Sequence, residues 1–252
     1  MDIEQAAELI WSEAAQGRWF PEALRGQLDF DAGHRVQLAV RERKLAAGRT
    51  QAGWKVGFTS DRVRRKFGTD QRPFGHLMSD GVYPSGATVP IFPHAALEPE
   101  LCLTLGATLG GADVTPQQAR RAVSAVSAAF ELNQGRSQGV SDVPLAVADN
   151  LSQWGIVVGA SLEPVPAELE LGEMTVVLRG DGQTAASVVG REVIDDHFLS
   201  LAMLAKTLAK YGLALEPGMK VITGSFAKVE VAPGQRWEAD FAGIGQVAVT
   251  FA

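Results

Sequence analysis

The chain has very little cysteine and no surplus of positive charge. Its 252 residues include one cysteine, Cys102, which excludes an internal disulfide and suits a reducing compartment. There are 23 lysines and arginines against 29 aspartates and glutamates, giving a net charge of -6. Nucleic-acid binding draws affinity from an excess of lysine and arginine, so this balance argues against nucleic acid as a partner.

Several other signals are missing. No run of about 18 apolar residues is present, so no membrane-spanning helix or membrane partner is expected. The acidic start, residues 1–5, has neither the basic residues nor the apolar stretch of a signal peptide, and we expect a cytoplasmic protein. Walker A and G-x-G-x-x-G motifs are absent, and the histidines lack the spacing of a zinc site or facial triad.

The residue pattern predicts an α+β fold. Helical periodicity predicts helices over residues 3–14, 31–47, 61–67, 115–126 and 195–211. Alternation and turn residues predict strands over 53–59, 82–83, 88–91, 97–105, 128–132, 154–158, 174–179, 221–223, 229–231 and 245–251, with a loop at 75–79. We therefore expect a helical N-terminal lobe that includes the Lys55 strand (1–70) and a β-rich catalytic body (71–252), forming one compact unit.

The motif Glu98-Pro99-Glu100 is the most informative feature of the chain. Strand alternation puts four leucines on one face, and the two glutamates with Cys102 on the other. Two carboxylates beside a core repel each other and stay ionised only if positive charge lies between them. A divalent cation meets this need, and oxygen ligands favour a hard ion such as Mg²⁺ or Mn²⁺. The alternative is a solvated sheet edge, where Pro99 is also tolerated.

Glu131 is a third carboxylate on a predicted strand with apolar neighbours. If its strand lies beside that of Glu98 and Glu100, three carboxylates converge and a metal site is indicated. If it does not, Glu131 is a carboxylate on the rim of the fold. The sequence alone leaves both arrangements open.

Lys55 follows Trp54 in a strand of apolar or small residues. Its side chain either extends to the surface or is desolvated, and desolvation lowers a lysine pKa toward the range useful for proton transfer. Asp80 follows the expected loop and can partner Lys55 or serve as a turn residue. The basic residues of 62–66 indicate either a solvated helix face or a capture site for an anionic substrate.

Taken together, these features resemble the 2-keto-4-pentenoate hydratase / 4-oxalocrotonate decarboxylase family of the fumarylacetoacetate hydrolase fold superfamily. The resembling segments keep the family's order over almost the whole chain and cover residues 54–60, 74–80, 98–101, 130–132, 148–150, 223–225 and 238–245. Several dispersed motifs in a fixed order are more specific than any one of them. One departure is Asn133-Gln134, where many relatives have Ile-Asp, although Arg136 is kept.

The resemblance implies a role for each matching residue. It implies that a Mg²⁺ or Mn²⁺ ion is held by Glu98, Glu100 and Glu131. It implies a catalytic proton-transfer pair formed by Lys55 and Asp80. It implies that the substrate site is shaped by Asp149, Asn150, Ser225 and Arg136.

The resemblance also implies a fold and an activity. The fold is a fumarylacetoacetase C-terminal-like mixed β-sheet body, a β-roll or sandwich, with a helical N-terminal lobe. The activity is metal-dependent hydration of a 2-hydroxy-2,4-dienoate to a 4-hydroxy-2-oxo acid in aromatic meta-cleavage catabolism. Decarboxylation of 2-oxo-3-hexenedioate is the alternative, because both reactions need the same electron sink.

More distant alternatives are C–C hydrolysis of an acylpyruvate and a non-catalytic partner subunit. Hydrolysis is disfavoured because the hydrolase branch tends to use aspartate where this chain has Glu131, and because the His–Glu pair of that branch has no counterpart here. The resemblance further implies a small 2-oxo or 2-hydroxy-dienoic acid substrate and a homo-oligomer. Association with a sister decarboxylase or hydratase subunit is also implied.

Overall fold

The computed structural model describes residues 2–137, 139 and 141–252. The α-helices are α1 (Ile3–Ala14), α2 (Phe30–Ala46), α3 (Asp61–Lys66), α4 (Pro116–Ala122), α5 (Val143–Ala148), α6 (Gly190–Val193) and α7 (His197–Ala209). Short 3-10 turns are η1 (Glu22–Leu24), η2 (Ser79–Gly81), η3 (Asn150–Ser152) and η4 (Leu171–Glu173). The strands are β1 (Gln51–Val56), β2 (Phe74–Met78), β3 (Val82–Pro84), β4 (Ala87–Val89), β5 (Ala95–Leu105), β6 (Val123–Gln134), β7 (Gln153–Leu162), β8 (Thr175–Gly180), β9 (Gln183–Val189), β10 (Lys220–Ser225), β11 (Val229–Glu230), β12 (Arg236–Phe241) and β13 (Gly245–Phe251).

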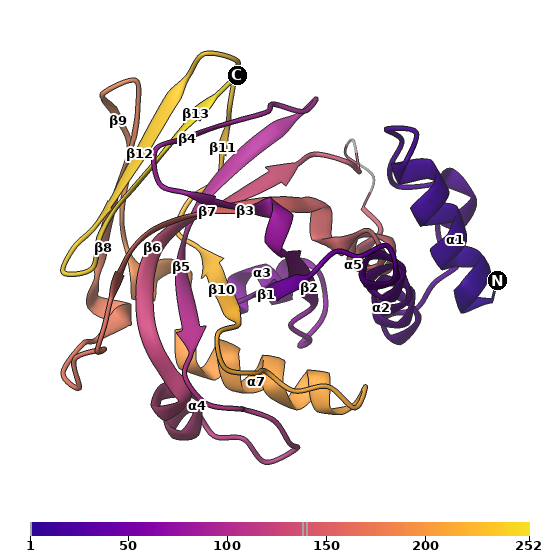
Figure 1. Cartoon of the computed structure of the whole chain (residues 1–252), viewed down its shortest axis with the longest axis horizontal. Coiled ribbons are helices and arrows are strands. Elements are labelled where there is room, and N and C mark those ends of the chain that lie inside the picture. Colours follow the sequence, from indigo (N-terminus) through magenta and orange to yellow (C-terminus); the bar gives the residue numbers. More distant parts are fainter. Residues whose placement is uncertain (1, 138, 140) are drawn as a thin grey trace.

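The strands form two mixed sheets. The larger sheet has the order β2-β1-β10-β5-β6-β7-β3, with β11 paired to β5, and the smaller has the order β4-β13-β12-β8-β9. In Figure 1 the smaller sheet lies over one end of the larger one, while α4 and α7 pack beside the other end. The main core lies between these layers, so the fold is α+β as the sequence predicts.

The alternation in β5 positions the acidic residues. Its leucines at 97, 101, 103 and 105 all enter the main core and are 0–1% exposed. The opposite face carries Glu100 and Cys102, and Cys102 packs there with Leu77 and Ile156. Since β5 lies between β10 and β6, it is an interior strand and the solvated-edge alternative is wrong. Cys102 is fully buried, and burial raises the pKa of its thiol to about 12, so it is an inert core residue.

The N-terminal helices form a second core with a later segment of the chain. α2 packs against both α1 and α5, on the right side of Figure 1. The apolar residues that they bury together include Ala7, Ile10, Val40 and Leu145. The helices predicted over 3–14 and 31–47 are thereby confirmed, whereas the pattern did not indicate α5. The domain division at residue 70 stays a prediction.

Two predicted elements are wrong. The expected loop at 75–79 is largely strand β2, which pairs antiparallel with β1 and is buried throughout. The helix expected over 115–126 starts at the predicted Thr115 cap but ends at Ala122, where β6 begins. The helical spacing of the following valines is overridden because β6 pairs with β5 along almost the whole length of both strands. Within the described part of the chain, no helix is both long and apolar enough to cross a membrane.

A buried histidine gives the fold a testable dependence on pH. His197, at the start of α7, is 3% exposed, and its Nδ1 lies 2.8 Å from Thr223 Oγ1. Burial lowers its pKa from 6.5 to about 4. The unfolded chain therefore binds a proton at this residue between pH 6.5 and pH 4 while the folded chain does not, so its contribution to stability is present above pH 6.5 and lost as the pH falls.

We expect His197→Asn to weaken the pH dependence of stability. Between about pH 7.5 and pH 5 the free energy of unfolding of the variant should fall by about 2 kcal/mol less than that of the wild type. Urea denaturation at the two pH values measures the difference. His94→Asn is the matched control, because His94 is exposed. An unchanged pH dependence in His197→Asn would contradict the assignment.

Candidate metal centre

Strand register brings three carboxylates together. Glu98 on β5 is paired directly with Glu131 on β6, and Glu100 follows two residues later on the same face of β5. One carboxylate oxygen from each residue lies within 4.8 Å of the other two. Glu100 and Glu131 are 2% and 1% exposed, and the side chain of Glu98 is 13% exposed. The predicted convergence of Glu131 with the other two glutamates is therefore present in the fold.

Each carboxylate is fixed by one donor. The Gly224 N–H donates to Glu100 Oε2 at 2.8 Å, and Lys228 Nζ donates to Glu98 Oε1 at 2.8 Å. Lys55 Nζ donates to Glu131 Oε1 within a buried ion pair. Glu131 Oε2 is also buried and has no hydrogen-bond partner among the described residues, which leaves an oxygen available to a ligand.

The three carboxylates carry more negative charge than the one buried cation beside them can neutralise. Lys55 is 5% exposed and is the buried cation of the cluster, whereas Lys228 reaches Glu98 from the surface. Burial disfavours the Lys55 ammonium, but the carboxylates of Glu131, Glu98 and Glu100 outweigh it and raise its pKa. Burial, and then repulsion from Glu131, hold the pKa of Glu100 well above its ordinary value. A further positive charge among the oxygens would relieve this cost.

Gly224 is required by the geometry of β10. The register of β10 against β5 shifts between Ile222 and Ser225, and Gly224 in that bulge has φ +126°. A Cβ at this position would lie 2.2 Å from Thr59 Oγ1. The glycine therefore lets the backbone turn its N–H toward the Glu100 carboxylate.

A cavity of about 590 Å³ opens beside the three glutamates, and we call it the carboxylate cavity. Its polar lining includes Lys55, the three glutamates, Asn133 and Ser225. One apolar wall is formed by Phe58 and Phe67, whose rings stack with centroids 4.9 Å apart. Arg62, Lys66 and Lys228 also line it, so the cavity has cationic side chains in addition to its buried lysine.

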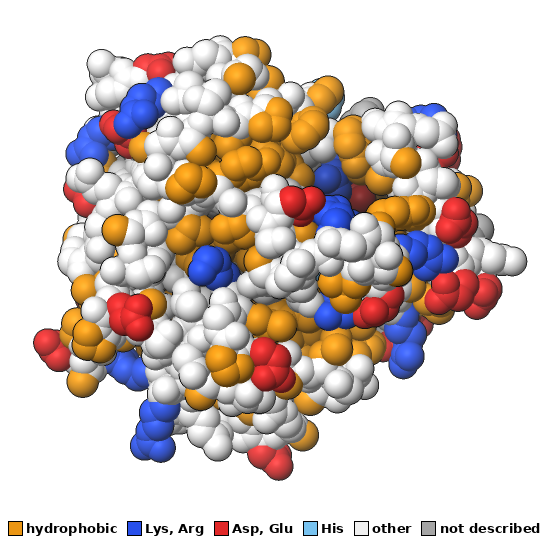
Figure 2. Space-filling view, viewed as in Figure 1, with side chains coloured by type: hydrophobic (Ala, Val, Ile, Leu, Met, Phe, Trp, Pro, Cys, Tyr) orange, Lys and Arg blue, Asp and Glu red, His pale blue; other side chains and the backbone are white. Residues whose placement is uncertain are grey.

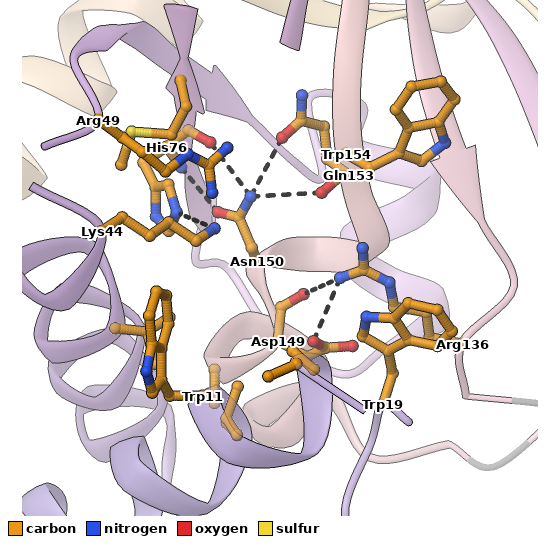
Figure 3. Close-up of a pocket in the computed structure, with 16 residues that line it drawn as sticks. Trp11, Trp19, Lys44, Arg49, His76, Arg136, Asp149, Asn150, Gln153 and Trp154 are labelled. Carbon is orange, nitrogen blue, oxygen red and sulfur yellow. Dashed lines mark hydrogen bonds and ion pairs between the residues drawn. The ribbon is translucent and has the colours of Figure 1, made fainter. Parts of the chain in front are cut away.

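The sequence-predicted site residues divide between two cavities, except Asp80, which lines neither of them. The carboxylate cavity contains Lys55, Ser225 and the three glutamates. Asp80 does not line it; its side chain is 58% exposed and pairs with Arg49 at 2.7 Å. The remaining residues, Arg136, Asp149 and Asn150, line a different cavity, shown in Figure 3. The substrate-binding and proton-transfer roles of these four residues stay predictions.

The sequence pattern did not identify several residues that line the carboxylate cavity. Phe58 and Phe67 are separated by the short helix α3, and only the fold shows that their rings stack. Lys228 belongs to the unusual Phe226-Ala227-Lys228 segment, and only strand pairing places it against Glu98. The glycine at 224 was visible in Thr223-Gly224-Ser225, but its contact with Glu100 was not.

The donor set fits a hard divalent ion. It consists of carboxylate oxygens only, and Mg²⁺ and Mn²⁺ favour such ligands. The unpartnered Glu131 Oε2 and the excess of buried negative charge both agree with a cation among the three glutamates. Asn133, which also lines the cavity, is a neutral side chain and donates its Nδ2–H to the Leu151 carbonyl at 3.3 Å.

The chain is similar over its full length to known hydratases and decarboxylases. No family model matches the chain. A 4-oxalocrotonate decarboxylase of a Pseudomonas species is 28% identical over 98% of this chain and 97% of its own length. The 2-keto-4-pentenoate hydratase of Paraburkholderia xenovorans is 27% identical over 98% and 94%. The solved 4-oxalocrotonate decarboxylase of Pseudomonas putida G7, complexed with magnesium and adipate, superposes with a TM-score of 0.91 at 26% identity, covering 99% of this chain and 97% of that one. The chain is therefore similar over its full length, in sequence and in structure, to 2-keto-4-pentenoate hydratases and 4-oxalocrotonate decarboxylases, and it has the fumarylacetoacetate hydrolase fold.

Proposed function

We propose that the chain is a lyase dependent on Mg²⁺ or Mn²⁺ that hydrates a 2-hydroxy-2,4-dienoate of the 2-oxopent-4-enoate type. The convergence of three carboxylates with the buried Lys55 in one cavity is the observation that carries this proposal. Full-length similarity to hydratases and decarboxylases supports the reaction class. The proposed setting is aromatic meta-cleavage catabolism in the cytoplasm.

We assign ion binding and proton transfer to different side chains. Glu98, Glu100 and Glu131 would hold the ion, which supplies an electrophile for the substrate carboxylate and 2-oxygen and favours negative charge on that oxygen. Lys55 Nζ lies against Glu131, so its ammonium is positioned at the same end of the cavity as the glutamates. We assign Lys55 the transfer of protons to and from the substrate carbon chain.

The reaction balances with one water. The 2-hydroxy-2,4-dienoate first becomes a 2-oxo-3-enoate, with the hydroxyl proton lost from O2 and a proton added at C5. Water then adds across the remaining double bond, its oxygen bonding to C4 and a proton going to C3, which gives a 4-hydroxy-2-oxo acid. Asn133 and Ser225 line the same cavity and provide polar groups that can hold the attacking water or the substrate carboxylate.

The walls of the cavity suit a flat unsaturated acid. The stacked rings of Phe58 and Phe67 provide an apolar surface for the diene, and Val56 and Leu151 extend it. Such walls lower the local dielectric around the glutamates, which strengthens the interactions of the charged substrate end.

Decarboxylation of 2-oxo-3-hexenedioate is the second candidate, favoured by one observation. Arg62 and Lys66 line the carboxylate cavity, and a dicarboxylate has a second anionic end that such cations would bind. In that reaction the C–C bond to the departing carboxylate breaks, its electrons move toward the 2-oxygen, and a proton is added at carbon. A homo-oligomer, and association with a sister hydratase or decarboxylase subunit, are further proposals drawn from the family.

Two substrates separate the candidates. Purified protein with Mg²⁺ is incubated with 2-hydroxypenta-2,4-dienoate and, separately, with 2-oxohex-3-enedioate. We expect loss of dienoate absorbance with formation of the 4-hydroxy-2-oxo acid and no CO₂ from the enedioate. Release of CO₂ from the enedioate without hydration of the dienoate would replace the first candidate by the second. Inactivity toward both would reject the proposal.

Glu100→Gln should abolish metal binding while keeping the fold. The amide has the shape of the carboxylate but lacks its charge, so Mg²⁺-dependent turnover should fall to background. Because the carboxylate is buried at a cost, the metal-free variant should melt at a temperature at least as high as the wild type, and added Mg²⁺ should no longer raise it. Glu230→Gln, an exposed position on β11, is the control. Normal metal-dependent activity in Glu100→Gln would refute the ligand assignment.

Lys55→Met should separate metal binding from proton transfer. The substitution keeps an unbranched apolar stem but removes the cation that pairs with Glu131, so the ion should bind as tightly or more tightly. Turnover should fall about 10²- to 10⁴-fold, the usual contribution of a positioned acid–base group. Calorimetry with Mn²⁺ and steady-state kinetics measure the two effects. Near-normal turnover would remove Lys55 from the proton-transfer role.

A further inference from the structure

A second cavity lies outside the carboxylate cavity, between the N-terminal helices and the large sheet. It has a volume of about 310 Å³ and shares no lining residue with the carboxylate cavity. Residues of α1, α2, β2 and the segment that joins α5 to β7 line it, as Figure 3 shows. In Figure 2 a hollow with lysine or arginine side chains separates the smaller part of the molecule on the right from the main body. We call this space the tryptophan cavity, after Trp11, Trp19 and Trp154 in its walls.

The walls combine flat aromatic surface with positive charge. Trp11 and Lys44 lie together on one side in Figure 3, with Arg49 above them, and Trp19 lies on the other side. The guanidinium of Arg136 lies 5.3 Å from the centre of the Trp19 ring, which holds that ring in place. Indole faces bind flat unsaturated or aromatic groups well, and lysine and arginine bind carboxylates.

One of these cations lacks an anionic partner. Arg136 pairs with Asp149 at 3.2 Å, and Arg49 pairs with Asp80 at 2.7 Å. Lys44 Nζ lies 2.9 Å from His76 Nε2 and forms no ion pair within the described part of the chain. Burial, then Arg49 and Arg136, lower the pKa of Lys44 to about 8, so it is still mainly cationic at neutral pH. A partly buried lysine that forms no direct ion pair is a binding point for an anion.

An unpartnered acceptor faces this cation across the cavity. Asp149 is 4% exposed, and its Oδ2 has no hydrogen-bond partner among the residues described, while its Oδ1 accepts from Arg136. Burial raises the pKa of Asp149 to about 6, although Arg136 and Lys44 favour its charged form. A buried carboxylate oxygen left without a donor is costly, and a hydroxyl from a ligand would satisfy it.

We propose that the tryptophan cavity binds a small flat hydroxy-carboxylate, of the hydroxylated aromatic acid class, at a site separate from the carboxylate cavity. The ligand carboxylate pairs with Lys44, with Arg49 beside it. The ring lies against the indoles of Trp11 and Trp19, and the hydroxyl donates to Asp149 Oδ2. The volume suits a single-ring acid.

Calorimetry with matched probes tests the site. The full-length protein with Mg²⁺ is titrated with the three isomers of hydroxybenzoate, and with benzoate and phenol as truncated probes. We expect at least one hydroxybenzoate to bind, benzoate to bind about ten-fold more weakly, and phenol to bind more weakly still, because each probe lacks one charged hydrogen bond. Failure of all three isomers to bind would overturn the proposal.

Variants locate the bound probe. Lys44→Met should weaken the best hydroxybenzoate about ten- to hundred-fold, whereas Lys206→Met on α7 should leave it unchanged. Asp149→Asn should remove the preference for that hydroxybenzoate over benzoate. Glu100→Gln should bind the probe as the wild type does, which separates this site from the proposed metal site. Circular dichroism checks the fold of each variant. Binding lost in Glu100→Gln but kept in Lys44→Met would place the probe at the metal and refute the proposal.

Discussion

The arrangement of this protein depends on three carboxylates enclosed by an apolar sheet. Glu98, Glu100 and Glu131 are brought together by the antiparallel register of β5 and β6, and a one-residue slip would turn them into the leucine core. Lys55 compensates part of their charge from β1, which is joined to β5 through β10. The strand order of the large sheet therefore places the Lys55 side chain beside the three carboxylates.

Unusual backbone conformations position polar groups around the carboxylate cavity. The bulge in β10 turns the Gly224 N–H toward Glu100. In the segment that joins α5 to β7, Asn150, Leu151 and Ser152 have consecutive positive φ values of 56°, 53° and 61°. The Asn150 side chain holds this strained segment to β2 by accepting from the His76 N–H at 2.8 Å and donating to the His76 carbonyl at 3.1 Å. Leu151 lines the carboxylate cavity while Asp149 and Asn150 line the tryptophan cavity, so one segment is the wall between them.

Local sequence patterns correctly predicted the elements that have their own periodicity or capping signal. The apolar residues of α1 and α7 have helical spacing, and the cap at Thr115 marked the start of α4. Local patterns gave wrong predictions where pairing with a distant strand decides the conformation. The segment of β2 contains glycine and histidine and looked like a loop, but β1 and the Asn150 side chain satisfy its backbone. The start of β6 has valines at helical spacing, but β5 provides a longer ladder.

The sequence by itself determined which residues could bind a cation, because strand alternation alone separates the glutamates of β5 from its leucines. Its motifs in a fixed order also indicated which known proteins the chain resembles, and the full-length similarity to hydratases and decarboxylases agrees with that resemblance. Only the tertiary structure decided that Glu131 and Lys55 join Glu98 and Glu100, since strand order is a long-range property. The same is true of Arg136, Asp149 and Asn150, which lie beyond the wall of the carboxylate cavity. Neighbouring residues of this turn line different cavities, and no local sequence pattern indicates which of them lie on the side of the three glutamates.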